Sequence, residues 1–433
     1  MHRIVIVGGG AGGLELATRL GNQSGRRGRV DVTLVDRCAT HIWKPLLHEA
    51  AAGSLDINAH EISYAAHSHW NNFRFVLGEL VGLDRRNRSI TIAPVLEESG
   101  NAVELLPARE LTYDSLVLAL GSQTNFFDVP GAHENAFPLD TLEQAERLRK
   151  RLIQLCLLKN SDRRPENDEA VQIAIIGAGA TGVELAAELR RMEQTLRQFG
   201  IASSRPGAAM RITLIERGSR VLPVLPQRVS ERSRLALELK DICVKAATPV
   251  TSVQADGVTV ADGSLIPADV TVWAAGIKAP AVLATLDGLA VNRINQVKVT
   301  SSLQSESDTK IFAIGDCAAC SGDLVVPPRA QAAHQQAMFL SKALAALTEN
   351  RPLGSFVYKD YGSLVSLGSL TAVGSIAAIT KIRPLAVEGL VAELLYAVLY
   401  RKHLVAVSGL RRTILATVAH MLRRQLNPRI KLH

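Results

Sequence analysis

Residues 3–20 read RIVIVGGGAGGLELATRL, and residues 172–189 read QIAIIGAGATGVELAAEL. Each copy begins with a run of β-branched apolar residues, which is typical of a strand buried in a parallel sheet. A glycine turn of the form G-x-G-x-x-G follows, and residues with helical spacing come after it. Because both copies keep this order, the chain is predicted to build one strand–turn–helix unit twice.

The three glycines of such a turn have separate roles. The first makes the tight turn, the second lets a pyrophosphate approach the backbone, and the third allows close contact of helix and strand. N–H groups at the start of the helix then bind the phosphates. The positions are Gly8, Gly10 and Gly13 in the first copy and Gly177, Gly179 and Gly182 in the second.

An acid closes the second predicted strand of each unit. VDVTLVD ends at Asp36, and RITLIE ends at Glu216. A carboxylate at this position accepts hydrogen bonds from ribose hydroxyls, so the sequence predicts two dinucleotide sites, a flavin and a nicotinamide that feeds it hydride. Glu216 would repel a 2′-phosphate and favours NADH over NADPH, an effect that Arg217 beside it weakens.

Three further apolar runs close on glycine: LVLAL before Gly121, VTVWAA before Gly276 and IFAI before the pair Gly315-Asp316. An acid at such a turn binds a sugar or ribityl hydroxyl, or it caps the next helix, and the local sequence leaves both open. These segments resemble the two-dinucleotide-fold flavoprotein reductases. In that superfamily the Gly-Asp pair binds FAD, and an NAD(P)H domain is inserted into the FAD domain.

The resemblance implies an α/β fold with two Rossmann-like dinucleotide-binding domains and a C-terminal helical segment. The expected division is residues 1–125 for the first part of the FAD-binding domain, 126–168 for a connecting segment, 169–285 for the NADH-binding domain, 286–370 for the second part of the FAD-binding domain, and 371–433 for a membrane-associating region.

The net charge is concentrated in the C-terminal region. The 433 residues carry a formal charge of +8, and residues 377–433 hold ten Lys or Arg against two Glu. The apolar segments 386–400 and 413–422 fall short of the about 18 residues of a transmembrane helix. Apolar helices with basic flanks suit a membrane interface, so residues 380–433 are predicted to bind an anionic lipid surface. The alternative is a buried helix pair with a basic face; the leucine-rich composition argues against a nucleic-acid partner.

Cysteine usage restricts the chemistry. Five cysteines do not make a disulfide framework and indicate a reducing compartment, and no signal peptide precedes the first predicted strand. A disulfide relay of the glutathione-reductase type needs a cysteine pair after the first acid, where Cys38 stands alone. Cys317 and Cys320 form a C-x-x-C, and their interpretation as small packing residues is favoured over a redox dithiol. The predicted chemistry requires no metal.

Three segments resemble type II NADH:quinone oxidoreductases: HIWKPLLHEAAAGSLD (41–56), VVPPRAQAAHQQA (325–337) and KDYGSLVSLG (359–368). Members of this family are single-subunit respiratory NADH dehydrogenases that do not pump protons. The resemblance covers essentially the whole chain and looks closest to the Gram-negative bacterial branch. It implies FAD as cofactor, NADH and a membrane quinone (ubiquinone or menaquinone) as substrates, a homodimer, and peripheral attachment to the cytoplasmic face of the bacterial inner membrane.

The resemblance also implies roles for four residues. Gln331 and Gln335 would lie on one helix face, where the quinone headgroup docks at the flavin. Glu184 is expected near the flavin and the quinone site as a proton-handling acid, although alone it reads as a first-turn acid favoured by the helix dipole. Lys44 is expected to approach the flavin.

Two other functions stay open on the sequence alone. One is a soluble NADH-dependent flavoprotein reductase with a protein or disulfide acceptor, in which the C-terminal region is a dimer contact. The other is a non-catalytic flavoprotein that senses NADH and works by binding partners.

Overall fold

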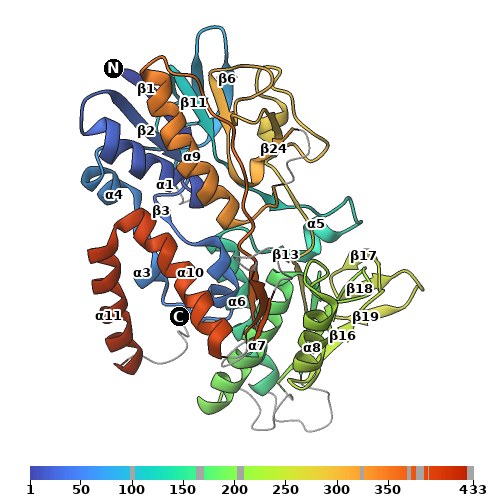
Figure 1. Cartoon of the computed structure of the whole chain (residues 1–433). Coiled ribbons are helices and arrows are strands. Elements are labelled where there is room, and N and C mark those ends of the chain that lie inside the picture. The colour runs from blue at the N-terminus through green and yellow to red at the C-terminus, as the bar shows by residue number, and fades with distance from the viewer. Residues whose placement is uncertain are drawn as a thin grey trace. The chain divides into compact units, whose positions relative to one another are not determined.

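A computed structural model describes residues 1–97, 103–161, 170–201, 209–321, 326–367, 372–376, 385–388 and 390–426 (Figure 1). The chain divides into two compact units. Unit 1 consists of Met1–Trp43, Glu61–Gln123 and Ile277–Lys359, and unit 2 consists of Lys44–His60, Thr124–Gly276 and Asp360–His433.

A five-stranded parallel sheet forms the centre of unit 1, in the order β23-β11-β1-β2-β5. Its strands are β1 (His2–Val7), β2 (Val30–Asp36), β5 (Arg74–Leu77), β11 (Ser115–Leu118) and β23 (Ile311–Ala313). Helix α1 (Ala11–Leu20) follows β1, as predicted, and packs against α9 (Ala330–Thr348). All of β11 is buried, which matches its continuous apolar run.

Unit 2 contains a second five-stranded parallel sheet, in the order β13-β20-β14-β15-β16. Its strands are β13 (Ala136–Pro138), β14 (Val171–Ile176), β15 (Met210–Ile215), β16 (Ile242–Lys245) and β20 (Val270–Trp273). Helix α7 (Ala180–Gln198) follows β14 as α1 follows β1. The other helices of this part are α2 (Leu47–Ala51), α3 (Ile57–His60), α5 (Ala132–Asn135), α6 (Leu142–Ser161) and α8 (Gln227–Glu238).

The two sheets correspond strand for strand, with β1 in the place of β14 and β2 in the place of β15. Each unit adds a three-stranded antiparallel sheet. These sheets are β6 (Leu80–Asp84), β7 (Ser89–Ile92) and β10 (Arg109–Thr112) in unit 1, and β17 (Val250–Gln254), β18 (Gly257–Val260) and β19 (Leu265–Pro267) in unit 2. The predicted α/β class with two Rossmann-like halves is confirmed. In each parallel sheet the strand order reverses beside the first strand, and ligands bind at the carboxyl edge of such a point.

Short elements complete unit 1. They are β3 (Thr40–His41), β4 (Ile62–Ser63), α4 (Tyr64–Trp70), β8 (Val95–Leu96), β9 (Glu104–Leu106), β22 (Val297–Val299) and β24 (Ala318–Cys320). Strands β3 and β4 pair antiparallel, which places His41 opposite Ile62, two residues before Tyr64.

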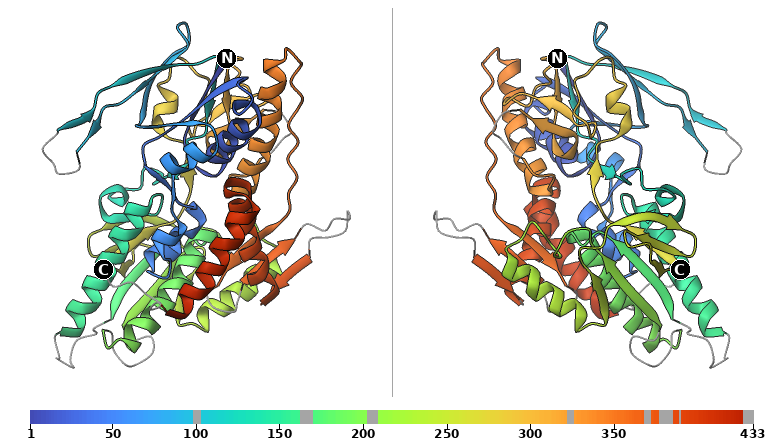
Figure 2. Two further views of the ribbon diagram at one scale, coloured as in Figure 1. Left: turned by 90° about the vertical axis from the view of Figure 1, so that its left-hand side faces the viewer. Right: turned by 90° about the vertical axis from the view of Figure 1, so that its right-hand side faces the viewer.

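The C-terminal part of unit 2 begins as a sheet. Strands β25 (Ser363–Ser366), β26 (Ala372–Ile376) and β27 (Leu385–Glu388) form an antiparallel meander, followed by α10 (Leu390–Ser408) and α11 (Leu410–Leu426). The expected apolar helix over 386–400 was therefore wrong at its start, because residues 385–388 pair with β26, a contact that a local window cannot show. Helices α10 and α11, in red, contact each other (Figure 2).

Among the described residues, no helix combines the length and the hydropathy needed to cross a bilayer. The two compact units differ in kind from the predicted domains, which are divided by the cofactor that each part binds. The predicted domain boundaries therefore stay a prediction.

Candidate functional site

The first glycine turn lies between β1 and α1. Gly8 has a φ of 103°, which L side chains rarely adopt, and a Cβ built there would lie 2.4 Å from the carbonyl oxygen of Ala119. A Cβ on Gly13 would lie 1.9 Å from the carbonyl oxygen of Gly8. Both positions therefore require glycine, the first for the turn and the second for the close approach of helix to strand.

Gly10 differs from these two glycines. It caps α1 in an extended conformation, with φ −65° and ψ −167° and no side-chain hydrogen bond, and the first turn of α1 carries no acid. A Cβ built on Gly10 has no heavy atom within 4 Å. The start of α1 thus presents its backbone to open space, an arrangement that fits the pyrophosphate of a dinucleotide.

Asp36 at the end of β2 holds this turn. Its Oδ2 accepts a hydrogen bond of 2.6 Å from the Gly9 amide, and its Oδ1 accepts one of 2.8 Å from the Cys38 amide. Burial raises the pKa of Asp36, and the two amide donors oppose this shift. Each carboxylate oxygen has a further lone pair, so Asp36 can accept hydrogen bonds from ribose hydroxyls while it anchors the turn.

The second turn, between β14 and α7, repeats this geometry. Gly177 also has a φ of 103°. A Cβ on Gly182 would lie 1.9 Å from the Gly177 carbonyl oxygen, and Gly179 has open space at its Cβ position. Gly179 caps α7 with φ −72° and ψ −172°. The second turn is therefore as well suited to a dinucleotide as the first.

Glu216 at the end of β15 takes the place of Asp36. Its Oε2 accepts a hydrogen bond of 2.8 Å from the Ala178 amide, and its Oε1 accepts one of 2.7 Å from the Gly218 amide. Ala178 corresponds to Gly9, and Gly218 corresponds to Cys38. The longer glutamate side chain makes the same two contacts, so the predicted turn–acid pairing is present in both units.

Gly121 and Gly276 lie after β11 and β20 and have left-handed φ values of 70° and 69°. A Cβ on Gly121 would have no atom within 4 Å, whereas one on Gly276 would lie 2.2 Å from the Phe127 ring. Gly276 also accepts a hydrogen bond of 3.2 Å from the Asn125 amide. Gly121 borders open space, and the glycine at position 276 serves the close packing of the chain.

Asp316 lies in one 3₁₀ turn, Gly315–Cys317, that leads into β24. No α-helix follows directly, so its interpretation as a helix cap is wrong. Its Oδ2 accepts a hydrogen bond of 2.7 Å from the Ser122 hydroxyl. Gly315 has a φ of 74°, and its amide donates to Oε1 of buried Gln336 at 2.7 Å. Sequence reasoning missed Ser122 and Gln336, although both lie inside segments that it singled out.

Gln331 and Gln335 both lie on α9, so the prediction that they share a helix is confirmed. Gln335 is bound to the backbone of Lys359. Its Nε2 donates to the Lys359 carbonyl at 2.7 Å, and its Oε1 accepts from the Lys359 amide at 3.0 Å. Gln335 therefore anchors the segment that follows α9, and the half-buried Gln331 stands one helical turn earlier.

Lys44 begins the short segment Lys44–His60 of unit 2. Its ammonium group lies 2.9 Å from Oδ1 of Asp140, and Oδ2 of Asp140 accepts a hydrogen bond of 2.7 Å from the Thr124 amide. In this structure Lys44 anchors Asp140.

Glu184 is a buried acid on α7, two residues after Gly182. Its Oε1 accepts a hydrogen bond of 3.0 Å from the Ser366 amide. Burial raises the pKa of Glu184 to about 8, the Ser366 hydrogen bond opposes this, and the charges of Glu49 and Glu188 add to it. Glu184 thus holds a proton at neutral pH, which a surface glutamate does not.

His48 on α2 is the nearest basic side chain that the structure records for Glu184. Its Nδ1 lies 3.6 Å from Oε2 of Glu184. Burial lowers the pKa of His48 to about 4, against the effect of a hydrogen bond to the Pro45 backbone. Both groups are therefore neutral at pH 7, and their contact is a carboxylic acid beside an imidazole, not an ion pair. The sequence alone predicts no role for His48, because its contact with Glu184 spans 136 residues of chain and no local pattern signals it.

Cys317 and Cys320 are free thiols. Burial raises the pKa of Cys317 to about 11, and burial also raises the pKa of Cys320. The thiolate that a redox dithiol needs is disfavoured at both positions, in agreement with the interpretation of the pair as packing residues.

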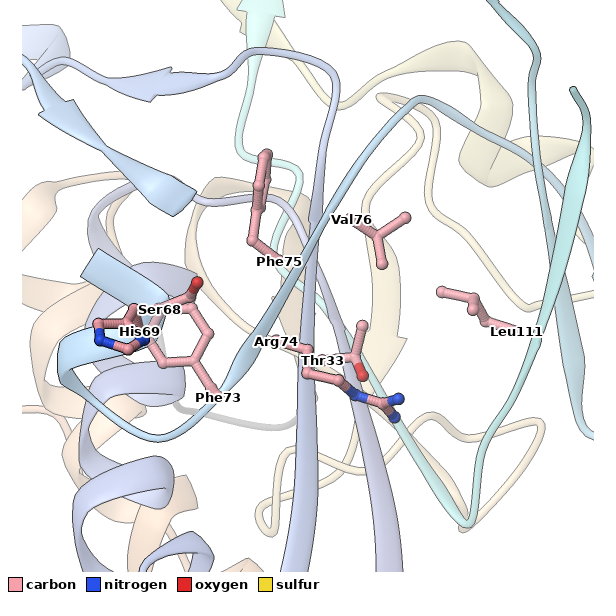
Figure 3. A pocket seen from close by; sticks show the side chains of 8 residues that line it. All are labelled: Thr33, Ser68, His69, Phe73, Arg74, Phe75, Val76 and Leu111. Atoms are coloured by element: carbon pink, nitrogen blue, oxygen red, sulfur yellow. The ribbon is translucent and has the colours of Figure 1, made fainter. Parts of the chain in front are cut away.

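A pocket of about 410 Å³ lies along β5 of unit 1 (Figure 3). Thr33, Phe73, Arg74 and other residues line it, and none of the predicted site residues does. Arg74 is paired with Asp31 at 2.5 Å. Among the described residues, no three His, Cys, Asp or Glu side chains gather in a way that could hold a metal ion.

The chain has clear relatives. The family model described as pyridine nucleotide-disulphide oxidoreductase matches residues 2–337. A type II NADH:quinone oxidoreductase of Haemophilus influenzae is 43% identical, with 100% of both chains covered. A demethylphylloquinone reductase of Synechocystis is 31% identical, with 84% of both covered. Among solved structures, NDH2 of Plasmodium falciparum in complex with NADH has a TM-score of 0.80 at 20% identity, covering 96% of this chain and 97% of that one, a likeness of fold.

The replacement Glu184→Gln is expected to change how stability depends on pH. The folded chain binds the Glu184 proton up to a pKa of about 8, whereas the unfolded chain releases it near the ordinary value of 4.5. The wild type therefore loses unfolding free energy as pH rises through this window, by up to about 1.4 kcal/mol per pH unit. A glutamine has no proton to release, so the variant should gain stability relative to wild type from pH ~5 to pH ~8.

Urea unfolding of both proteins across that range measures the difference. Glu238→Gln is a matched control, because Glu238 is an exposed partner of Arg234 at 3.7 Å and should contribute little at any pH. A stability difference between wild type and Glu184→Gln that stays constant with pH would contradict the raised pKa.

Proposed function

We propose that each of the two glycine turns binds one of two dinucleotides, because the chain belongs to the pyridine nucleotide-disulphide oxidoreductases and, within them, to the type II NADH:quinone oxidoreductases. The two dinucleotides are the FAD and the NADH of that family's reaction. The enzyme transfers electrons from NADH through FAD to quinone. FAD, when bound, supplies the hydride acceptor and passes the two electrons on. The alternatives of a soluble reductase with another acceptor and of a non-catalytic sensor are not favoured by any observation.

The first turn is assigned to FAD. Gly8, Gly10 and Gly13 would form the turn and Asp36 would bind the ribose, with Gly121, Gly315 and Asp316 completing the set in the same unit. The open space at Gly10 supports a dinucleotide at this turn, because a pyrophosphate needs such access to the backbone. Its identity as FAD rests on the Gly315-Asp316 pair in the same unit, which binds FAD in the family that the chain resembles. Asp316 is held by Ser122, and its remaining lone pairs would accept a hydrogen bond from a hydroxyl of the flavin.

The second turn is assigned to NADH. Gly177, Gly179 and Gly182 would bind its pyrophosphate, Glu216 its ribose hydroxyls, and Gly276 would border the site. The carboxylate of Glu216 is fixed by two backbone amides, so it cannot easily turn away from a 2′-phosphate. This favours NADH over NADPH. The domain division at residues 1–125, 126–168, 169–285, 286–370 and 371–433 follows from the same assignment.

Glu184 and the glutamines of α9 are proposed for the quinone half of the reaction. Gln331 would donate a hydrogen bond to a quinone carbonyl, and Gln335 would position this part of the chain through Lys359. Glu184 would supply a proton, since an acid with a pKa of about 8 still carries one at neutral pH and is close to the best value for a general acid there. Lys44 would support the flavin side through Asp140.

The quinone substrate is lipid-soluble, so the enzyme is membrane-associated. We assign the lipid contact to α11. Five apolar side chains of this helix are at least half exposed, and their positions i, i+4, i+5, i+8 and i+12 fall along one side: Leu410, Ile414, Leu415, Val418 and Leu422. The exposed Arg411 and Arg412 flank the start of this stripe. Such a helix suits the interface of an anionic membrane.

Two further proposals rest on the family resemblance. The enzyme would be a homodimer, and it would lie on the cytoplasmic face of the bacterial inner membrane. Light scattering in detergent measures the first, and protease access to inverted membrane vesicles measures the second.

The turn assignment predicts opposite losses for Gly10→Val and Gly179→Val. Neither replacement meets a neighbouring atom at Cβ, and both backbones are extended, so the fold should persist. Gly179→Val should keep its flavin absorbance near ~450 nm and bind NADH at least about tenfold more weakly, because charge-assisted hydrogen bonds to phosphate are lost. Gly10→Val should be purified without flavin. Each variant is the control for the other, and loss of flavin from Gly179→Val would contradict the assignment.

The replacement Gln331→Ala is expected to separate the two half-reactions. It should slow the oxidation of reduced enzyme by a short-chain quinone about tenfold, the value of a lost hydrogen bond to substrate, and leave flavin reduction by NADH unchanged. Stopped-flow absorbance measures both steps. Gln227→Ala, on the exposed side of α8, is the control. Equal slowing of the two steps would exclude a quinone-specific role.

The apolar stripe of α11 predicts a separation of membrane binding from chemistry. The triple variant Ile414→Ser, Leu415→Ser and Leu422→Ser should bind vesicles of phosphatidylglycerol and phosphatidylcholine at least about tenfold more weakly, because buried methylene groups contribute about 0.8 kcal/mol each. Reduction of a water-soluble quinone should persist.

Co-sedimentation with these vesicles measures the effect. The control is Leu235→Ser with Leu239→Ser, two leucines at the C-terminal end of α8 that are more than half exposed and lie outside the stripe. Unchanged sedimentation of the triple variant, or equal loss in the control, would exclude α11 as the lipid contact.

A further inference from the structure

The carbonyl oxygen of Gly9 accepts hydrogen bonds from two side chains. The Tyr64 hydroxyl donates at 2.8 Å, and Nδ1 of His41 lies at 2.9 Å. A carbonyl oxygen can only accept, so the proton of the neutral imidazole is on Nδ1. Both side chains are buried. Two neutral hydrogen-bond donors therefore hold the Gly9 carbonyl of the first glycine turn in place.

The local fold brings these donors together. His41 ends β3 and Tyr64 begins α4 directly after β4, and the pairing of β3 with β4 places the two side by side. Their rings have centroids 6.3 Å apart, and the Tyr64 ring packs against Phe75 at 5.1 Å. The Tyr64 amide also donates to the Ala39 carbonyl at 3.1 Å. Neither donor has freedom to turn away from Gly9.

Fixing this carbonyl also fixes the amide of Gly10. The Gly9 carbonyl and the Gly10 N–H belong to one planar peptide group and point in opposite directions across it; no described peptide bond is cis. With the oxygen held toward His41 and Tyr64, the Gly10 N–H is directed away from them. Hydrogen bonds to the oxygen also polarise the peptide group, which makes its N–H a stronger donor.

In the second turn the corresponding carbonyl is held by a backbone amide instead of side chains. The carbonyl of Ala178, which corresponds to Gly9, accepts a hydrogen bond of 2.8 Å from the backbone amide of Leu222. The duplicated turns thus share an anchored carbonyl, supplied by the main chain in one unit and by two side chains in the other.

This difference accounts for one letter of the sequence. The first turn reads Gly8-Gly9-Gly10 where the second reads Gly177-Ala178-Gly179. A Cβ on Gly9 would lie 2.4 Å from the Tyr64 ring and hydroxyl. Position 9 is glycine because Tyr64 occupies the space that the Ala178 methyl group has in the other turn.

Both donors stay neutral over the working pH range. Burial lowers the pKa of His41 to about 4, with the Gly9 hydrogen bond opposing and nearby His67 adding to the shift. Burial, together with the charges of Asp36 and Cys38, raises the pKa of Tyr64 well above its ordinary value. Neither group competes with the phosphate for the positive end of α1.

We propose that His41 and Tyr64 are positioning residues for FAD, which hold the Gly9 carbonyl so that the Gly10 amide donates to the cofactor pyrophosphate. This rests on the proposed assignment of the first turn to FAD. The two side chains contact the Gly9 carbonyl, and they act through the orientation of one peptide group.

The test measures the affinity of the holoenzyme for FAD. Dilution of each purified variant releases FAD, whose fluorescence recovers, and the released fraction gives the dissociation constant. Tyr64→Phe and His41→Leu should each bind FAD about fivefold to tenfold more weakly, the value of one neutral hydrogen bond. His41→Asn should stay within about twofold of wild type, because its amide keeps a donor near the position of Nδ1. The KM for NADH should not change, since the second turn is intact.

Tyr113→Phe is the matched control. Among the described residues the Tyr113 hydroxyl is buried without a hydrogen-bond partner, so its removal should leave FAD affinity unchanged and should not lower the melting temperature. If His41→Leu fails to fold, the comparison of Tyr64→Phe with Tyr113→Phe decides alone.

Two results would overturn the proposal. One is an FAD dissociation constant within about twofold of wild type in both Tyr64→Phe and His41→Leu. The other is an equal loss in His41→Asn and His41→Leu, which would mean that ring packing and not the donor matters. Loss of flavin from Gly10→Val together with either result would leave the FAD assignment standing, whereas retained flavin in Gly10→Val would overturn that assignment itself.

Discussion

One hydrogen bond organises the dinucleotide turn in each half of this chain. Its donor is the amide of the residue after the first glycine, and its acceptor is a carboxylate at the end of the second strand. Asp36 makes it to Gly9 and Glu216 to Ala178. The bond closes a loop of 27 residues in the first unit and 38 in the second. Loop-closure entropy grows slowly with length, so the intervening chain can differ while the turn and the acid keep one geometry.

The duplicated frame diverges at the position two residues after the third glycine. Glu15 in α1 and Glu184 in α7 are both buried there. Glu15 has Arg19 at 2.7 Å on the next turn of its helix and His334 at 2.7 Å. The residue in the place of Arg19 is Glu188 in α7. The first copy therefore keeps its acid among hydrogen-bonding nitrogen donors, as a structural contact of α1 with α9. In the second copy Glu49 and Glu188 lie near the acid, and the part of the chain that the structure describes records no positive charge acting on it.

Local sequence predicts what depends on local geometry. The two strand–turn–helix units, their glycines and their acids follow from strand, turn and helix patterns within about 40 residues. Ser122, His48 and Tyr64 could not be found this way, because each acts on a group more than about 50 residues away in the chain. Gln336 acts on Gly315 only 21 residues away, but no turn or helix pattern signals that contact. The register of β3 with β4 brings Tyr64 to Gly9 across 55 residues. The strand over 385–388 was missed for a different reason, because its pairing with the nearby strand β26 overrides its apolar helical pattern. The family resemblance pointed to Gln335 as a site residue. The structure adds the contact that the resemblance could not reveal, because both groups of the Gln335 amide are bound to the Lys359 backbone.

The neutral state of Glu184 and His48 is a consequence of burial that suits the proposed chemistry. Quinone reduction takes up two electrons and two protons, and an electron that arrives without a proton leaves a charge whose cost is high where water is excluded. An ionised Glu184 would add its own negative charge close to Glu49 and Glu188, in addition to the charge that the electron brings. Protonated, it adds none, and the imidazole beside it at 3.6 Å is also neutral at pH 7, because burial lowers the pKa of His48 to about 4. The same burial that costs unfolding free energy above pH ~5 thus keeps the Glu184 carboxyl protonated near neutral pH, as its proposed role as a proton donor requires.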